Sequence, residues 1–380
     1  MRRGALVVHL NRRQGELSLS VESRVVSGQQ PRPLEGASDP AAPPPTGRTG
    51  AAFRGLGLVL ALAALVLVGL LSIWVGTRGI PFTATWNVLW NPDGSETSVI
   101  IHDYRIPRTV LGLLVGTALG LAGALMQALT RNPLADPGML GVNLGASAGV
   151  VVAIAFLGIA APLGYVWFAL AGAAAASVGV FLLGSSGRKL ASPERLVVAG
   201  AAVTAVLYAF NWAILLLNPR AFDQFRFWTV GSLAGRYHDI VLMSLPFIAV
   251  GLVIALVLAP SLNALAMGDQ MGRALGVNVG RTRALGAVAV MLLCGAATAA
   301  AGPIGFVGLA VPHIARFVVG PDQRWVFAYS MLIAPVLLIG SDVLGRVLGA
   351  PGEVQVGIVT AFIGAPLFIA LCRRRKLVML

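Results

Sequence analysis

From residue 55 to residue 372 the chain is a succession of apolar runs with little polar sequence between them. A helix that crosses a lipid bilayer needs about 20 mostly apolar residues, and most of the runs reach that length. The runs are rich in Ala, Leu, Val and Gly, which is typical of spanning helices rather than of barrel strands. They predict helices at residues 55–76, 108–130, 138–159, 162–184, 195–217, 239–259, 281–301, 304–319, 325–346 and 354–372.

The composition excludes a soluble domain. Of the 380 residues, 57% are hydrophobic and 11% are charged, whereas soluble domains carry about 25% charged residues. The mean hydropathy is +0.83. The sequence therefore predicts an all-α integral membrane protein with about ten transmembrane helices.

The basic residues predict the orientation of these helices. The net charge of +13 would suggest a nucleic-acid partner in a soluble protein, but no basic stripe with interleaved aromatics follows the chain. If the first helix leaves the cytoplasm, 21 of the 28 lysines and arginines lie on the cytoplasmic side. Seven lie on the other side: Arg78, Arg105, Arg108, Arg220, Arg226, Arg236 and Arg346. The positive-inside rule then places both termini in the cytoplasm.

The first 53 residues differ from the rest. They are polar and irregular, with a proline-rich run at Pro40–Pro45, and their apolar stretch Ala5–Leu10 is too short for a signal-peptide core. We expect residues 1–53 to form a disordered cytoplasmic tail and residues 54–376 to form the transmembrane domain.

Neither the cysteines nor the histidines predict a metal site. Cys294 and Cys372 lie inside apolar runs, and the four histidines are scattered over separate segments. His313 follows Pro312, so we expect it to hydrogen-bond around the break in the helix rather than to bind a metal. Any metal that this protein carries should travel as a chelate.

Four stretches of the sequence resemble the motifs of a known family. They are Arg105–Arg108 with Gln127–Gly138, then Leu262–Val277, Gly302–Arg316 and Gly357–Phe368. In this order and spacing they resemble the permease family that imports iron–siderophores, haem and cobalamin through ABC transporters. The resemblance runs from about residue 54 to the C-terminus.

This resemblance implies an assembly in the bacterial cytoplasmic membrane. Two permease subunits, each of ten helices, enclose one path as a dimeric pore, and the second subunit is either a copy or a paralogue. Two cytoplasmic ABC ATPase subunits and an extracytoplasmic substrate-binding protein complete it. The only lysines, Lys189 and Lys376, lie in no phosphate loop, so we expect no enzyme activity and no cofactor in this chain. ATP and Mg would belong to the ATPase.

The polar segment 261–278 lies between two predicted spans. Its short apolar faces are interrupted by glycines, which predicts two small helices with a turn that could fill a groove on a partner. The resemblance implies that this loop couples the permease to the ATPase, and an amphipathic loop on the lipid surface is the alternative. The coupling candidates are Leu262, Leu265, Met267, Gly268, Arg273, Leu275 and Gly276.

Three arginines on the outer side call for a role of their own. The resemblance implies that Arg105, Arg108 and Arg346 pair with acidic residues of the binding protein, a contact that favours orientation and association rate. The alternative is snorkelling into lipid headgroups. Asp342 precedes Arg346 by four residues, so the two are expected to form an ion pair rather than a proton relay.

The predicted path follows the span 195–217. Thr204, Tyr208 and Asn211 supply its few polar groups, which either line the path or bond to neighbouring helices. The resemblance implies a short extra helix within residues 218–236. It also implies a cytoplasmic gate loop made by Ala191, Ser192, Pro193 and Glu194.

Glycines at helical spacing predict close packing of the span 108–130. Gly112, Gly116, Gly120 and Gly123 nearly share one face, and small residues let two backbones approach in lipid. We expect this face to contact other helices rather than a ligand.

The motifs together predict a permease for ferric siderophores or a similar metal chelate. A haem or cobalamin permease is the alternative, because those permeases share the same motifs. An ion-coupled secondary transporter would need a coupling-ion site, usually with buried acids in repeated halves, and an intramembrane enzyme would need clustered polar residues in helical register. The sequence presents neither.

Overall fold

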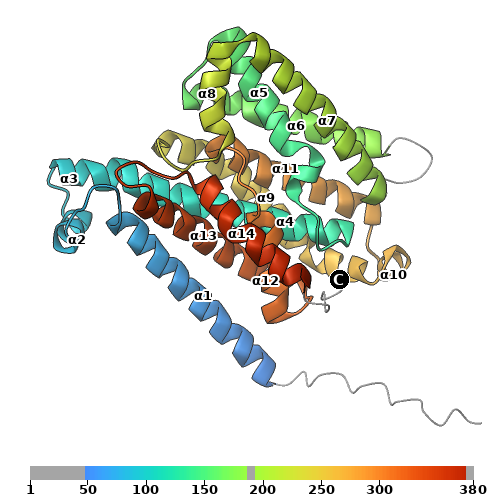
Figure 1. Ribbon diagram of the computed structural model, residues 1–380. Coiled ribbons are helices and arrows are strands. Elements are labelled where there is room, and N and C mark those ends of the chain that lie inside the picture. Colours follow the sequence, from blue (N-terminus) through green and yellow to red (C-terminus); the bar gives the residue numbers. More distant parts are fainter. Residues whose placement is uncertain (1–47, 186–192, 374–380) are drawn as a thin grey trace, which may run out of the picture. The chain divides into compact units, whose positions relative to one another are not determined.

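The computed structural model describes residues 48–185 and 193–373, and within them the helices are joined by loops and turns and no strand occurs (Figure 1). The predicted all-α class is confirmed. Residues 1–47 of the predicted tail lie outside the described ranges. The first helix begins at Arg48, so the last residues of that tail, 48–53, are helical rather than disordered.

A helix lies at each of the ten predicted spans. Seven stretches within the described residues are long and apolar enough to cross a membrane, and Val142–Leu157, Val307–Val319 and Val356–Ala370 are shorter apolar helices. The helices are α1 (Arg48–Trp74), α4 (Ile106–Thr130), α5 (Val142–Leu157), α6 (Pro162–Ser185), α7 (Pro193–Leu217), α9 (His238–Ala266), α11 (Val279–Ala301), α12 (Val307–Val319), α13 (Gln323–Leu348) and α14 (Val356–Arg373).

Shorter helices fill several of the connections. The sequence did not predict α2 (Phe82–Trp90), α3 (Glu96–Val99) and the π-helix η1 (Ile100–Arg105), which continues directly into α4. Ser95 starts α3 by accepting a hydrogen bond from the Ser98 amide at 3.2 Å. A 3-10 turn η2 (Pro137–Leu140), α8 (Pro219–Thr229) and α10 (Asp269–Ala274) complete the chain. Helix α8 confirms the extra helix expected within residues 218–236.

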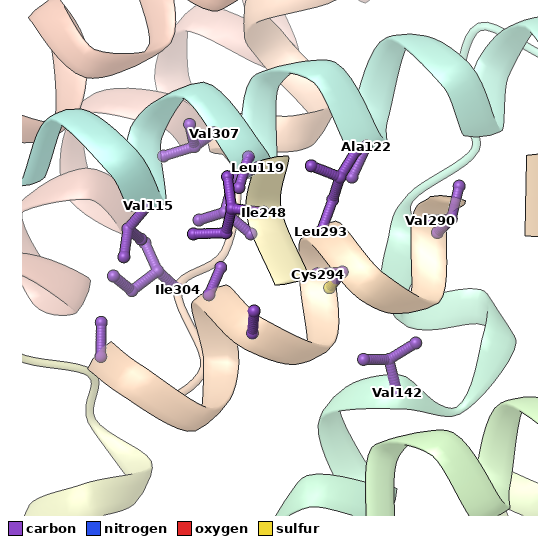
Figure 2. Close-up of a cluster of buried hydrophobic side chains, with 14 of the residues drawn as sticks. Val115, Leu119, Ala122, Val142, Ile248, Val290, Leu293, Cys294, Ile304 and Val307 are labelled. Atoms are coloured by element: carbon purple, nitrogen blue, oxygen red, sulfur yellow. The ribbon is translucent and has the colours of Figure 1, made fainter. Parts of the chain in front are cut away.

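Helix α4 runs through the middle of the core. Its buried side chains meet those of α9, α11 and α12, as Figure 2 shows for Val115, Leu119, Ala122, Ile248, Leu293 and Val307. Both faces of α4 are buried over most of its length, which is unusual for a helix at a lipid boundary. The core is therefore organised around this one helix.

Glycines on α4 allow backbone contact with its neighbours. A Cβ atom added at Gly116 would collide with the backbone of Pro335 in α13, and one added at Gly123 would collide with the carbonyl of Gly308 in α12. In lipid, where packing replaces the hydrophobic drive, such small residues bring helices together. The predicted packing role of the glycine face is confirmed.

We expect the substitution Gly116→Leu to destabilise the fold. The added side chain meets backbone atoms that cannot yield, and overpacking of this kind costs at least about 1–3 kcal/mol. A Gly69→Leu substitution in α1 is the matched control, because nothing lies within 4 Å of an added Cβ there. Thermal unfolding in detergent measures both, and equal melting temperatures would contradict the packing role of Gly116.

Candidate functional site

A buried carboxylate joins two arginines at the end of the bundle where α1 finishes. Only 2% of Asp342 is exposed. Arg108 of α4 donates from Nε to Asp342 Oδ2 at 2.9 Å and from Nη2 to Oδ1 at 2.8 Å, a bidentate contact. Arg346, one turn further along α13, reaches Asp342 Oδ2 at 2.9 Å. The predicted pair of Asp342 with Arg346 is confirmed, and Arg108 is the partner that spacing could not reveal.

Arg105 and Arg346 bond to carbonyl groups in the last turn of α1 and just beyond it. Arg346 Nη1 donates to the carbonyls of Ser72 and Val75 at 2.8 Å each, and Arg105 donates to those of Ile73, Trp74 and Arg78 at 2.9, 2.5 and 3.0 Å. Ser72, Ile73 and Trp74 lie in the last turn of α1, where a helix leaves its carbonyls without partners and positive charge is favourable. The two guanidinium groups therefore fasten α1 to α4 and α13.

This placement does not fit the predicted docking role of Arg105 and Arg346. Both residues are buried, and their donors are already used inside the chain. Sequence alone indicated that these arginines lie on the outer side but gave no sign that α1 would end beside them. The docking role itself stays a prediction, and of the three arginines only Arg108 is bonded to a partly exposed carboxylate, that of Glu353.

A basic cavity opens beside this network. It has a volume of about 630 Å³ and is lined by five arginines and two glutamates, with Arg78 and Arg236 added to the three arginines already described. Arg108 Nη1 contacts Glu353 Oε2 at 2.8 Å, and the Glu353 side chain is 31% exposed. Arg78 pairs with the exposed Glu96. The excess of arginine makes the cavity suited to a carboxylate or another anion.

Two of the sequence motifs bond to one another in the core. Arg316 Nη1 donates to Gln127 Oε1 at 2.5 Å, and Gln127 Nε2 donates to the Leu309 carbonyl at 3.1 Å. Both side chains are buried. A buried charge needs hydrogen bonds, and Gln127 supplies one to Arg316, whose Nε and Nη2 find no partner among the described residues. Gln127–Gly138 and Gly302–Arg316 are therefore parts of one structural unit.

The loop between α4 and α5 is held by its own side chains. Asp136 accepts a hydrogen bond from the Gly138 amide at 2.7 Å and so starts the turn η2. Burial raises the pKa of the Asp136 carboxyl above its usual range. Beyond the turn, Thr298 donates to Asn143 at 2.9 Å, which ties α5 to α11. These contacts give Asp136 a structural role in the turn and connect α5 to the core.

An acidic residue fastens α10 at the opposite end of α4. Arg131 ends α4 in a left-handed conformation and donates to Asp269 Oδ1 at 2.7 Å. Arg283 of α11 reaches both Asp269 oxygens at 3.0 Å. Charged hydrogen bonds of this kind are strong and directional. Asp269 thus links the short helix to α4 and to α11 at once.

The structure corrects the predicted shape of the segment 261–278. The sequence predicted a span that ends at residue 259, but α9 continues through Pro260 to Ala266. Leu262 and Leu265 therefore belong to α9 and are buried in the bundle. They cannot fill a groove on a partner, and α10 is the one short helix in this segment.

An apolar patch nevertheless faces outward on and beside α10. Met267, Met271 and Leu275 follow one another every four residues and are 61%, 51% and 58% exposed. Arg273 and Gly276 are also exposed, and Gly268 supplies the left-handed turn that starts α10. Sequence reasoning missed Met271, although its spacing from Met267 and Leu275 was the signal. We call Met267, Met271 and Leu275 the apolar patch of α10.

The predicted path residues do not share one environment. Tyr208 is exposed on α7, Thr204 is half-buried, and Asn211 is only 4% exposed. The side-chain amide of Asn211 finds no hydrogen-bond partner within the described part of the chain. The path stays a prediction for all three residues, and Asn211 differs from the other two because it is buried within the chain.

The predicted gate loop lies mostly beyond what the structure describes. Ala191 and Ser192 fall outside the described residues, while Pro193 is the first residue of α7 and Glu194 lies in its first turn. No group of three or more His, Cys, Asp or Glu that could hold a metal occurs in the ranges 48–185 and 193–373. The gate stays a prediction.

Comparison with known proteins gives a family and close relatives. The profile of the FecCD transport family matches residues 64–374. The ferric enterobactin transport system permease protein FepD of Escherichia coli is 44% identical over 86% of this chain and 97% of that protein. The Fe(3+)-citrate import system permease protein YfmD of Bacillus subtilis is 41% identical over 85% of this chain and 96% of that protein.

A solved structure has the same fold. It is described as a metal-chelate type ABC transporter in an inward-facing conformation, and it aligns with a TM-score of 0.73 at 26% sequence identity. The alignment covers 83% of this chain and 98% of that one. The helical arrangement described here is therefore that of a membrane ABC transporter.

We expect the substitution Asp342→Asn to destabilise the protein strongly. It leaves Arg346 buried without a negative partner and leaves Arg108 with Glu353 alone, and breaking a buried pair in this way costs about 3–5 kcal/mol. The matched control is Glu96→Gln, which breaks an exposed pair with Arg78 and is expected to cost below about 1 kcal/mol.

Thermal unfolding of both variants in detergent measures the difference. A melting temperature of the Asp342→Asn variant that equals that of the control would show that the network contributes little to the fold.

Proposed function

The chain belongs to the FecCD transport family, and on that premise we propose that it is the permease subunit of an ABC importer that brings ferric siderophores or similar ferric chelates into the cytoplasm. The observation that carries the proposal is the 44% identity to a ferric enterobactin permease over nearly the whole of that protein. The identity to a ferric citrate permease supports the same substrate class. Haem and cobalamin permeases are the alternative that these relatives do not favour.

In the proposed assembly the ten helices cross the bacterial cytoplasmic membrane with both termini inside. A second permease subunit, a copy or a paralogue, completes a dimeric pore, and two ABC ATPase subunits hold the ATP and Mg. Helix α7 supports this arrangement, because it presents Val198, Val206, Leu216 and Leu217 outward, each at least 69% exposed. We expect this exposed apolar face to be covered by lipid or by a second subunit.

The ATPase is proposed to dock on the apolar patch of α10. The patch lies on the side that the basic residues mark as cytoplasmic, and exposed methionines and leucine suit a hydrophobic groove. Asp269 joins α10 to Arg131 of α4 and Arg283 of α11 by short bonds. A movement of the ATPase would reach both helices through this residue, as rigid elements carry coupling between sites.

The binding protein is proposed to dock over the basic cavity. Arg108 is held from inside by Asp342 and from outside by Glu353, whose side chain is partly exposed. A carboxylate of the binding protein could replace Glu353 on Arg108 without disturbing the buried pair. In this form the docking prediction rests on Arg108 directly, while Arg105 and Arg346 hold α1 and the network in place.

We expect the double substitution Met271→Asp with Leu275→Asp to uncouple the ATPase. It places two charges on the apolar patch, so the ATPase should no longer co-purify and transport should be lost while the permease remains folded in the membrane. The control Gln270→Asp adds a charge to the same helix outside the patch. Transport by the double variant at the rate of this control would exclude the patch as the docking surface.

We expect the substitution Glu353→Gln to speed association with the binding protein. It removes the internal competitor for Arg108 and leaves Asp342 untouched, and electrostatic complementarity acts mainly on association rates. The control Glu96→Gln removes the same charge from the same cavity without contact to Arg108. Association rates at several salt concentrations measure the effect. Equal acceleration by both variants would argue against docking on Arg108.

The substrate class is tested by uptake into cells that lack this chain. We expect the uptake of radioactive iron to fall for one class of ferric chelate among catecholates, hydroxamates and citrate, and to return when the chain is supplied. Haem and cobalamin uptake are measured in the same cells as the control. Loss of cobalamin or haem uptake, with iron uptake unchanged, would overturn the proposed substrate.

A further inference from the structure

An aromatic stripe runs along one face of α2. Phe82, Trp86 and Trp90 follow one another every four residues and are 54%, 47% and 66% exposed. The rings of Phe82 and Trp86 are stacked with centroids 6.0 Å apart, and those of Trp86 and Trp90 meet at 5.9 Å. Three large aromatic rings thus form one continuous exposed surface. The proposed function of the chain does not involve this surface.

The stripe continues onto the end of α1. Trp74, the last residue of that helix, meets the ring of Phe82 edge-on at 5.5 Å. Helix α1 is a candidate membrane span with mean hydropathy 2.8, and only 6% of its most apolar window is buried in the fold. The exposed surface of α1 is therefore suited to lipid, and the stripe extends this surface at the end of the candidate span.

The opposite face of α2 is fixed against the protein. Thr85 and Val88 are buried, and the ring of His102 in η1 bonds to the Val88 carbonyl at 3.1 Å. These contacts set the rotation of α2 about its axis. The stripe therefore points away from the bundle because the opposite face of α2 is packed against the protein.

We propose that α2 is an interfacial helix whose stripe of Phe82, Trp86 and Trp90, together with Trp74, lies at the headgroup–acyl boundary of the bilayer. Tryptophan is enriched at this level because its ring is apolar and its N–H is polar. Helix α2 contains no charged residue, so a polar partner gains no ion pair there, whereas a lipid boundary suits uncharged aromatic rings.

This anchor gives the end of α1 a fixed depth. The same end of α1 is held by Arg105 and Arg346, which line the basic cavity. Anchoring α2 in the interface therefore sets the height of the cavity above the bilayer. The inference rests on the membrane-spanning fold and does not depend on the substrate or on the docking of a partner.

Spin labels in reconstituted bilayers test the proposal. One cysteine at a time is introduced and labelled, by the substitutions Phe82→Cys, Trp86→Cys and Trp90→Cys. The background carries Cys372→Ala, and the remaining native cysteine, Cys294, is buried. The control is Asn87→Cys, on the neighbouring exposed face of α2. We expect the ratio of accessibility to oxygen over accessibility to a water-soluble nickel chelate to be several-fold higher at the three stripe positions than at position 87.

Three results would overturn the proposal. Strong access of the nickel chelate at all four positions would place the stripe in water. Exclusion of both oxygen and nickel from the stripe would show that a protein covers it, either a second copy or a partner.

The third result comes from fluorescence of the unlabelled protein. Brominated lipids should quench less tryptophan fluorescence after the substitutions Trp86→Phe and Trp90→Phe than before them. Equal quenching before and after would contradict the proposal even if a labelled variant failed to fold.

Discussion

The buried carboxylate of Asp342 is the contact on which the arrangement of the outer end depends. It neutralises Arg108 of α4 and Arg346 of α13 where charges are costly unless paired. Arg346 can then bond the terminal carbonyls of α1, which would otherwise lack partners. One acidic side chain thereby holds three spanning helices together and shapes the cavity beside them. Arg105, Arg108 and Arg346, which the sequence places on the outer side, all make contacts that hold the helices together. Of these contacts, the one between Arg108 and the partly exposed Glu353 is the one that a carboxylate of a partner could replace.

Helix α4 connects this network to the other end of the bundle. It begins beside Arg108 and ends at Arg131, and its 25 residues span about 37 Å at 1.5 Å per residue. Glycine contacts hold it tightly against α12 and α13, and Gln127 fixes it to Arg316. Helix α4 is thus packed closely along much of its length and bonded by charged side chains near both ends. It connects the two surfaces on which we propose that a binding protein and an ATPase dock.

The spans and the Asp342–Arg346 pair could be predicted because they depend on residues close together in the chain. Apolar length located ten helices, and a spacing of four located the pair. The contacts of Arg108 with Asp342 and of Gln127 with Arg316 join residues far apart in sequence, so no local pattern contains them. The predicted span ends at residue 259, whereas α9 continues through Pro260 to Ala266, so Leu262 and Leu265 belong to α9 and not to the predicted small helices. Helix α2 escaped prediction because nine residues are too few for a span.

We propose that ATP hydrolysis on a separate subunit drives import of a ferric chelate through this chain. Transport is measured in vesicles that contain the permease and its ATPase, with ATP enclosed on the α10 side and chelate-loaded binding protein on the other. We expect chelate uptake that requires ATP and persists when ionophores abolish every ion gradient. Uptake without ATP that follows a proton or sodium gradient would contradict it, and would identify the chain as a secondary transporter.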